Sequence, residues 1–353
     1  MTKYLLGIIA ILAIVIAISI KPQKQSTAQT QKIVEIAPPI APELPEEKTP
    51  RLPSISVAIP ASLEYPKIIE QVRKWETEAP DLAETGFYGK TKRGVEICYI
   101  KICNKVVAKP RPKVLITGCI HGNEPWATAE VMAYAGTLLK EYGKNKEVTD
   151  IVDSREIYIV PVVSPDSYPH SRHVDGVDPN RDFPGPSRPN HQSTPSIDAI
   201  QKFFNKIKPN AVISGHTFGR IYLTPYGDSK TPCPNESDYK RIVGKMATMS
   251  QYKIDHACNM YSTVINGSEV DWYYRNGAFS IVMEFGTHQR KPSKEEIESE
   301  FKRTWESVKL FIKEAPVVAV KSNAEFLDFL ENTGISHDYF QRQIGAMHQQ
   351  GQN

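Results

Sequence analysis

The chain is 353 residues long, with a formal net charge of +3 and 40% hydrophobic residues. This length suits one large α/β domain or two small ones. Lys and Arg are scattered among Asp and Glu, so the near-neutral charge gives no extended field that would attract nucleic acid, and we expect no nucleic-acid partner.

The N-terminal segment is strongly apolar. Residues 4–20 carry no charge and almost no polar side chain, which is close to the shortest run that crosses a bilayer as a helix. A cleaved secretory signal has a shorter apolar stretch and a small-residue cleavage site. We therefore expect residues 1–21 to form an uncleaved transmembrane anchor, with a cleaved signal as the alternative. Residues 22–61 are rich in proline and predict an extended linker.

Beyond the linker, apolar strands alternate with amphipathic helices. Strands are predicted at 95–102, 114–120, 157–163, 211–214 and 279–283. Helices are predicted at 68–75, 125–142, 195–207, 239–246 and 293–312, the last opened by a capping box from Ser293 to Glu296. This alternation is typical of an α/β fold with a mixed, mostly parallel central sheet and helices on both faces. Residues 62–316 would form this domain, and residues 317–353 a C-terminal tail.

The five cysteines show no zinc-knuckle spacing. Cys98 and Cys103 lie on one predicted strand and point to opposite faces, so they cannot bridge each other. Cys233 and Cys258 can pair, but nothing in the sequence requires it, and the redox compartment stays open.

Three residues that can bind a metal follow predicted strands. His121 and Glu124 lie three apart after strand 114–120, and His216 follows strand 211–214. This spacing alone occurs by chance in many proteins, and Glu124 by itself is more simply explained as a negative charge at a helix N-terminus. Two imidazoles and one carboxylate are, however, a ligand set of catalytic zinc sites, where the fourth position is left for water. The sequence therefore predicts one zinc ion held by these three residues.

A polar loop follows strand 157–163. Arg181 offers a bidentate fork for a carboxylate, Asn180 adds an amide, and Arg172 adds a second guanidinium. Asp178 can accept a hydrogen bond from a metal-bound imidazole. Any single loop arginine is more simply explained as a surface charge. This loop therefore indicates a binding site only in combination with the candidate metal ligands.

Glu284 is a charged residue at the end of strand 279–283, where a structural salt bridge is an equally good explanation. However, His121, the loop at 180–181, His216 and Glu284 all follow or end strands. Ligands of open α/β sheets bind at the carboxyl ends of the strands. We therefore expect these residues to meet at one edge of the sheet.

The order of these motifs resembles the M14 zinc metallocarboxypeptidases over about residues 62–315. The matching features are His-x-x-Glu, Asn-Arg, a strand ending in His, the Asp-Trp pair at 271–272 and a strand ending in Glu. Residues 219–227 are similar to the family's strand after the third metal ligand. The roles that the resemblance implies are a general base (Glu284), a group that polarises the scissile carbonyl (Arg172), binders of the substrate carboxylate (Asn180 and Arg181) and a residue that orients His121 (Asp178).

Two further positions carry over from the family. Tyr261 matches its mobile tyrosine if a small insertion is allowed. Val270, just before the Asp-Trp pair, matches the position that sets side-chain preference, and its apolar character argues against a basic preference. Glu269 beside it leaves that preference open.

The expected activity is zinc-dependent metallocarboxypeptidase hydrolysis of a peptide bond near a free carboxylate by metal-activated water. Protein C-termini and peptidoglycan stem peptides are both possible substrates. One alternative is a zinc N-acyl amino acid deacylase of the aspartoacylase and succinylglutamate desuccinylase type, whose motifs residues 121–124 and 180–185 also resemble. Another is a non-catalytic, zinc-containing peptide-binding module.

The expected cellular location of the catalytic domain rests on this chemistry and not on the charges that flank the apolar segment. Lysines after the apolar segment would place the body of the protein in the cytoplasm. Because the chemistry suits extracellular or cell-wall peptides, we expect a catalytic domain outside the cytoplasm, anchored to the membrane by the N-terminal helix, or secreted if that segment is cleaved.

Overall fold

The structure is a computed structural model that describes residues 50–55, 63–107, 109–260 and 263–321. The predicted N-terminal span at 1–21, most of the linker predicted at 22–61, the predicted tail beyond residue 321 and Tyr261 lie outside these residues. Within the described ranges, no helix is both long and apolar enough to cross a membrane.

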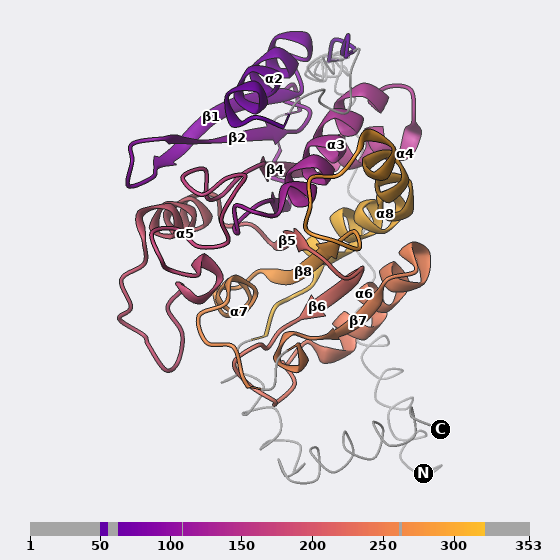
Figure 1. Ribbon diagram of the computed structural model, residues 1–353. Coiled ribbons are helices and arrows are strands. Elements are labelled where there is room, and N and C mark those ends of the chain that lie inside the picture. The colour runs from indigo at the N-terminus through magenta and orange to yellow at the C-terminus, as the bar shows by residue number, and fades with distance from the viewer. Residues whose placement is uncertain (1–49, 56–62, 108, 261–262, 322–353) are drawn as a thin grey trace, which may run out of the picture. The chain divides into compact units, whose positions relative to one another are not determined.

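The fold is built on an eight-stranded sheet in the order β1-β2-β4-β3-β5-β8-β6-β7 (Figure 1). The central strands β4, β3, β5 and β8 run parallel to one another, β6 and β7 also pair in parallel, and β2 and β6 join the centre antiparallel. This confirms the predicted mixed, mostly parallel sheet. The strands are β1 (Ala83–Lys90), β2 (Glu96–Ile102), β3 (Lys113–Thr117), β4 (Glu156–Val160), β5 (Ala211–Thr217), β6 (Ile221–Thr224), β7 (Lys253–His256) and β8 (Phe279–Phe285).

Helices cover both faces of the sheet, as the alternating pattern predicts (Figure 1). Val114 and Ile116 of β3 lie in a core shared with α2, α3, α4, α6 and α8, whereas Leu115 lies in a second core with α5 and α7. The apolar run of β3 is therefore buried on both sides, as parallel strands require. The helices are α2 (Tyr65–Glu78), α3 (Pro125–Glu141), α4 (Lys146–Ser154), α5 (Pro195–Ile207), α6 (Glu236–Ser250), α7 (Glu269–Arg275) and α8 (Lys294–Glu314).

All the strands and helices predicted from periodicity are present, with shifted ends. The capping box of α8 is confirmed, because Ser293 Oγ accepts from Glu296 N at 3.2 Å and Glu296 Oε2 accepts from Ser293 N at 2.8 Å. The structure also contains β1, β7, α4 and α7, which are not among the predicted elements. In β1 two glycines break the pattern, and at Gly89 a Cβ would lie 2.5 Å from Ala199 Cβ of α5. This glycine therefore lets the edge strand approach the helix closely.

The five cysteines are all free and buried, so Cys233 and Cys258 do not form the disulfide that the sequence leaves open. Burial raises the pKa of the Cys119 and Cys233 thiols. Buried thiols of raised pKa are poor nucleophiles, which makes these residues part of the packing.

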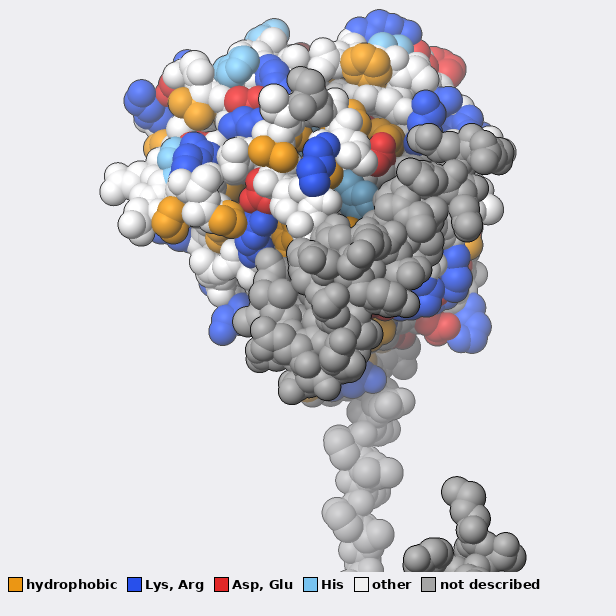
Figure 2. Space-filling view, turned by 90° about the horizontal axis from the view of Figure 1, so that it is seen from below, with side chains coloured by type: hydrophobic (Ala, Val, Ile, Leu, Met, Phe, Trp, Pro, Cys, Tyr) orange, Lys and Arg blue, Asp and Glu red, His pale blue; other side chains and the backbone are white. Residues whose placement is uncertain are grey.

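Charged side chains are mixed on the face of the molecule drawn in Figure 2. Lys and Arg lie among Asp and Glu there, and hydrophobic side chains are interspersed with both. Exposed ion pairs such as Lys67 with Glu70 and Lys202 with Asp198 contribute little to stability, because solvent screens them.

Candidate metal centre and active site

The candidate site lies where neighbouring parallel strands end. His121 follows β3, while His216 of β5 and Glu284 of β8 are paired residues in the register of these two strands. Because β3, β5 and β8 are parallel neighbours, their carboxyl ends deliver the three side chains to one edge of the sheet. The structure therefore brings together the residues that the sequence predicts to meet.

His121, Glu124 and His216 form a buried cluster whose candidate ligand atoms all lie within 4.8 Å of one another. Nδ1 of His121 is 2.8 Å from Oε1 of Glu124, and Nδ1 of His216 is 3.1 Å from its Oε2. Glu124 precedes α3, but its side chain makes no capping hydrogen bond. The carboxylate thus faces the imidazoles, in addition to placing a negative charge at the N-terminus of α3.

The electrostatics of this cluster favour a cation. Burial by itself would raise the pKa of Glu124, but His121 and His216 outweigh it and lower the pKa to about 2. Burial lowers the pKa of His216, and the carboxylates of Glu124 and Glu269 more than reverse this and raise it. Carboxylates therefore favour positive charge between the two imidazoles. Two imidazoles and one carboxylate, within reach of a common centre, fit the donor set of a catalytic zinc site.

Each imidazole contacts a second carboxylate through Nε2, the ring nitrogen that does not face Glu124. Nε2 of His121 lies 3.0 Å from Oδ1 of Asp178, the partner that the sequence predicts. Nε2 of His216 lies 2.7 Å from Oε1 of Glu269. This role of Glu269 cannot be predicted from the sequence, because no local spacing links residues that lie 53 positions apart.

Glu284 lines the same cavity as the three candidate ligands. Its Oε2 is buried and has no hydrogen-bond partner within the described chain. Burial raises the pKa of Glu284 to about 7, a shift that nearby Glu124 adds to and His216 opposes. A carboxyl group with this pKa can both accept and release a proton near neutrality.

Arg172 belongs to the polar loop and lies beside the metal cluster. Its Nε and Nη2 donate to Oδ2 of Asp178 at 3.2 and 3.0 Å, and its Nη1 is 3.7 Å from Oε1 of Glu124. Burial would raise the pKa of Asp178, but His121 and Arg172 more than offset this and lower it. The guanidinium is therefore fixed beside the metal cluster by the same carboxylate that holds His121.

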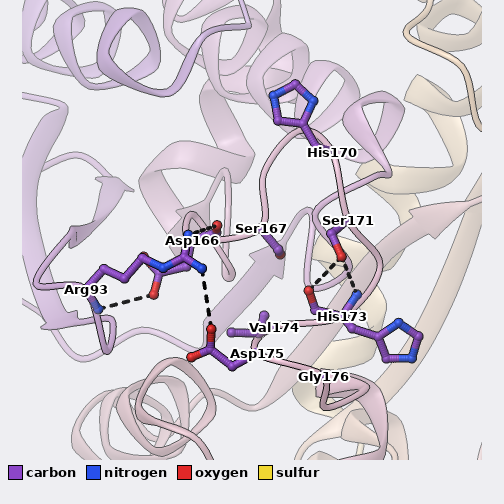
Figure 3. Close-up of a pocket in the computed structure, with 9 residues that line it drawn as sticks. All are labelled: Arg93, Asp166, Ser167, His170, Ser171, His173, Val174, Asp175 and Gly176. Carbon is purple, nitrogen blue, oxygen red and sulfur yellow. Dashed lines mark hydrogen bonds and ion pairs between the residues drawn. The ribbon is translucent and has the colours of Figure 1, made fainter.

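The segment that carries Arg172 and Asp178 is tied to the connection between β1 and β2. Figure 3 shows Arg93 reaching from that connection to Asp166 and Asp175. Its backbone N–H donates to Asp166 Oδ2 at 3.3 Å, and its Nη2 lies 3.4 Å from Asp175 Oδ1. Arg93 thus contacts both ends of the segment 166–175, which precedes Asp178. The sequence does not indicate this role of Arg93.

Asn180 and Arg181 line the cavity together with Arg172. Oδ1 of Asn180 accepts a hydrogen bond from the backbone N–H of Glu269 at 2.9 Å. This contact commits the amide oxygen and leaves the NH₂ group as the donor that Asn180 can offer to a ligand. The structure therefore places the two residues predicted to bind a carboxylate beside the predicted metal ligands.

The cavity has a volume of about 280 Å³, and one part of it is lined by apolar side chains. Val270 lies in this part and is almost fully buried. Leu223, Ala257 and Val282 pack around it. Glu269 is directed towards His216, so it adds no charge to this apolar recess. Val270 can be predicted from the sequence as a substrate-binding position, but the recess cannot, because its walls come from four separate segments.

The family model for zinc carboxypeptidases, Peptidase_M14, matches residues 68–307. The chain therefore belongs to this family, and zinc is the metal that its His-Glu-His cluster is suited to hold. It is 28% identical over 227 residues to metallocarboxypeptidase A of Arthroderma otae, an alignment that covers 52% of this chain and 53% of that protein. The chain thus spans about half the length of the curated relatives it matches.

Solved structures share the fold. The chain is similar to thrombin activatable fibrinolysis inhibitor, with a TM-score of 0.65, 18% identity and coverage of 76% of this chain and 77% of that chain. It is also similar to carboxypeptidase A from Helicoverpa armigera, with a TM-score of 0.63, 19% identity and coverage of 74% and 76%. At these identities the likeness concerns the fold alone.

Proposed function

We propose that the protein is a zinc-dependent carboxypeptidase that releases an apolar residue from the C-terminus of a peptide. The observation that carries this proposal is one cavity lined by the metal cluster, Glu284, the polar side chains of Arg172, Asn180 and Arg181, and an apolar recess. A substrate whose last residue has an apolar side chain and a free carboxylate matches all of these groups at once.

The carboxylate end of the substrate would bind to Asn180 and Arg181. A guanidinium binds a carboxylate through two parallel hydrogen bonds, and an amide donor adds a third. Val270 and its apolar neighbours would receive the side chain of the last residue. These contacts would place the last peptide bond beside Glu284 and the metal cluster.

The bond cleavage would use groups already in position. A zinc ion held by His121, Glu124 and His216 would supply Lewis-acid activation of water. Glu284 would accept a proton from the attacking water and return it to the leaving amine. Arg172 would donate hydrogen bonds to the carbonyl oxygen as that oxygen gains negative charge.

The apolar recess favours ordinary peptide C-termini over peptidoglycan stem peptides. The diaminopimelate side chain ends in a charged amino acid group, and burying such a group without a partner costs several kcal/mol. Within the recess, Leu223, Ala257, Val270 and Val282 offer no charged partner.

The test is hydrolysis by the zinc-loaded protein of N-blocked peptides that end in Leu, Phe, Lys or Glu. Peptides with an amidated C-terminus serve as matched controls. We expect release of Leu and Phe with kcat/KM at least about 10²-fold above that for Lys or Glu, because the charged side chains would be buried unpaired. The amidated peptides should be cut at least about 10-fold more slowly, since they lose the charge-assisted hydrogen bonds.

Other outcomes would contradict this proposal. Preferential release of diaminopimelate from purified muropeptides would favour the cell-wall substrate. Hydrolysis of N-acyl amino acids without hydrolysis of peptides would favour the deacylase. Stoichiometric zinc with no hydrolysis of any of these compounds would favour a binding module.

A further inference from the structure

Glu269 is a fully buried carboxyl residue at the start of α7. Its Oε1 lies 2.7 Å from Nε2 of His216, and its Oε2 has no hydrogen-bond partner within the described chain. In the described residues, His216 is also its one ion-pair partner within 4 Å. Burying a carboxyl group with so little compensation lowers stability, so its position indicates a role beyond stability, and the group that it contacts is His216.

The contact selects one tautomer of His216. Because Nδ1 of His216 faces Glu124, Nδ1 is the nitrogen directed at the metal position. A carboxylate behind Nε2 requires the proton on Nε2, which leaves the Nδ1 lone pair for the metal. Glu269 therefore fixes both the rotation of the ring and the position of its proton.

The backbone of the same residue reaches the carboxylate-binding group. The N–H of Glu269 donates to Oδ1 of Asn180 at 2.9 Å. This hydrogen bond orients the Asn180 amide, as the side-chain contact orients the His216 ring. One residue thus contacts a candidate metal ligand through its side chain and a candidate substrate-binding residue through its main chain.

The approach to α7 holds Glu269 in a fixed position. Gly267 has φ +77°, and a Cβ at this position would lie 2.6 Å from the backbone oxygen of Arg181. Its carbonyl accepts a hydrogen bond from Phe183 N at 3.1 Å. The segment before Glu269 therefore packs directly against the loop that carries Asn180 and Arg181.

We propose that Glu269 is a positioning residue that orients His216 for zinc and Asn180 for the substrate carboxylate. The part concerning the substrate rests on the proposed carboxypeptidase function, whereas the part concerning zinc does not. Glu269 contacts Nε2 of His216 as Asp178 contacts Nε2 of His121. The two residues differ in that Asp178 also forms an ion pair with Arg172. In the described residues, the carboxylate of Glu269 has no ion-pair partner other than the candidate ligand His216.

The experiment compares zinc affinity in the full chain of the wild type, E269Q and E269D by competition with a chromophoric chelator. Gln keeps the size of the side chain but removes its charge, and Asp keeps the charge but shortens the reach. We expect zinc affinity to fall about 10–100-fold in E269Q and to fall less in E269D. E130Q is the matched control, because Glu130 is a fully buried carboxyl residue of α3 outside the site, and its zinc affinity should equal that of the wild type.

Two further measurements separate positioning from a structural role. The visible spectrum of the cobalt-substituted protein should change in E269Q and not in E130Q, because the spectrum reports the ligand geometry. In E269Q, kcat for a peptide ending in Leu should fall while KM changes little, because the backbone N–H that orients Asn180 is retained.

Some results would overturn the inference. Wild-type zinc affinity and an unchanged cobalt spectrum in E269Q, with only a lowered stability of the metal-free protein, would make Glu269 structural. If E269Q fails to fold, E269A, which also removes the carboxylate, takes its place, and wild-type zinc affinity in E269A would overturn the inference equally. Reduced zinc affinity in E269Q together with a wild type that cleaves no peptide would support the positioning of His216 and refute the carboxypeptidase proposal instead.

Discussion

Arg172 is bound to Asp178 through two hydrogen bonds, from its Nε at 3.2 Å and from its Nη2 at 3.0 Å. Asp178 also contacts Nε2 of His121 at 3.0 Å through its other oxygen. One carboxylate therefore fixes both a candidate metal ligand and the guanidinium beside it. The Arg172 side chain can be removed without breaking the contact between Asp178 and His121.

Replacing Arg172 with Ala is expected to lower kcat by about 10²–10³-fold, because a donor to the developing negative charge is lost. Zinc affinity should change little, since Asp178 still holds His121. Steady-state kinetics on a peptide ending in Leu, with a zinc titration, would measure both quantities. H173A is the matched control, because this exposed neighbour lies in the same loop. An unchanged kcat in R172A would refute the role of Arg172.

Glu284→Gln tests the proton transfer. Gln has nearly the same shape but cannot accept the proton of the attacking water, so we expect kcat to fall by about 10²–10⁴-fold with zinc still bound. The measurements are single-turnover hydrolysis and metal content by elemental analysis. E70Q, an exposed change on α2, should behave as the wild type. Near-normal turnover in E284Q would exclude this residue as the base.

Val270→Asp tests the apolar recess. Val270 is packed against Leu223 and Val282, and the side chains of this recess offer no cation to pair with a carboxylate there. We expect kcat/KM to fall at least about 10-fold for peptides ending in Leu and to rise for those ending in Arg. The ratio of the two values is the measurement, with V270A as the size control. A variant that kept its Leu to Arg ratio would show that this recess does not receive the side chain.

Glu130→Gln tests a buried carboxyl group outside the site. Both oxygens of Glu130 lack hydrogen-bond partners within the described residues, and burial, assisted by Glu300, raises its pKa well above the usual value of 4.5. With a raised pKa, the folded state binds the proton of Glu130 more tightly than the unfolded state does. This contribution to the free energy of unfolding is fully present below pH 4.5 and is lost as the pH rises towards the folded-state pKa.

The stability difference between E130Q and the wild type should therefore depend on pH. Gln does not titrate, so the free energy of unfolding of E130Q should exceed that of the wild type increasingly above pH 4.5, by up to about 1.4 kcal/mol for each pH unit. Urea unfolding of the metal-free proteins from pH 4 to pH 8 would measure this difference. A constant difference across that range would mean that Glu130 does not titrate as its burial implies.

The elements that can be read from the sequence are those that show either a continuous apolar run or an apolar stripe at helical spacing. Strand β3 is a run of apolar residues buried on both faces, and the buried stripe of α2 consists of Ile68, Val72 and Trp75 at helical spacing. The short helix α7 is different, because every residue from Glu269 to Tyr274 is buried and no polar face marks it. Periodicity depends on contrast between faces, and such segments have none.

The sequence by itself determined the α/β architecture, the order of the candidate ligands and their position after strands that end at one edge of the sheet. It did so because parallel strands connected through helices have few possible arrangements. Only the tertiary structure decided which acid contacts which imidazole nitrogen, and that Glu269 faces His216 and not the recess around Val270. Those contacts join residues distant in the chain, and the direction of each side chain depends on the packing of several segments at once.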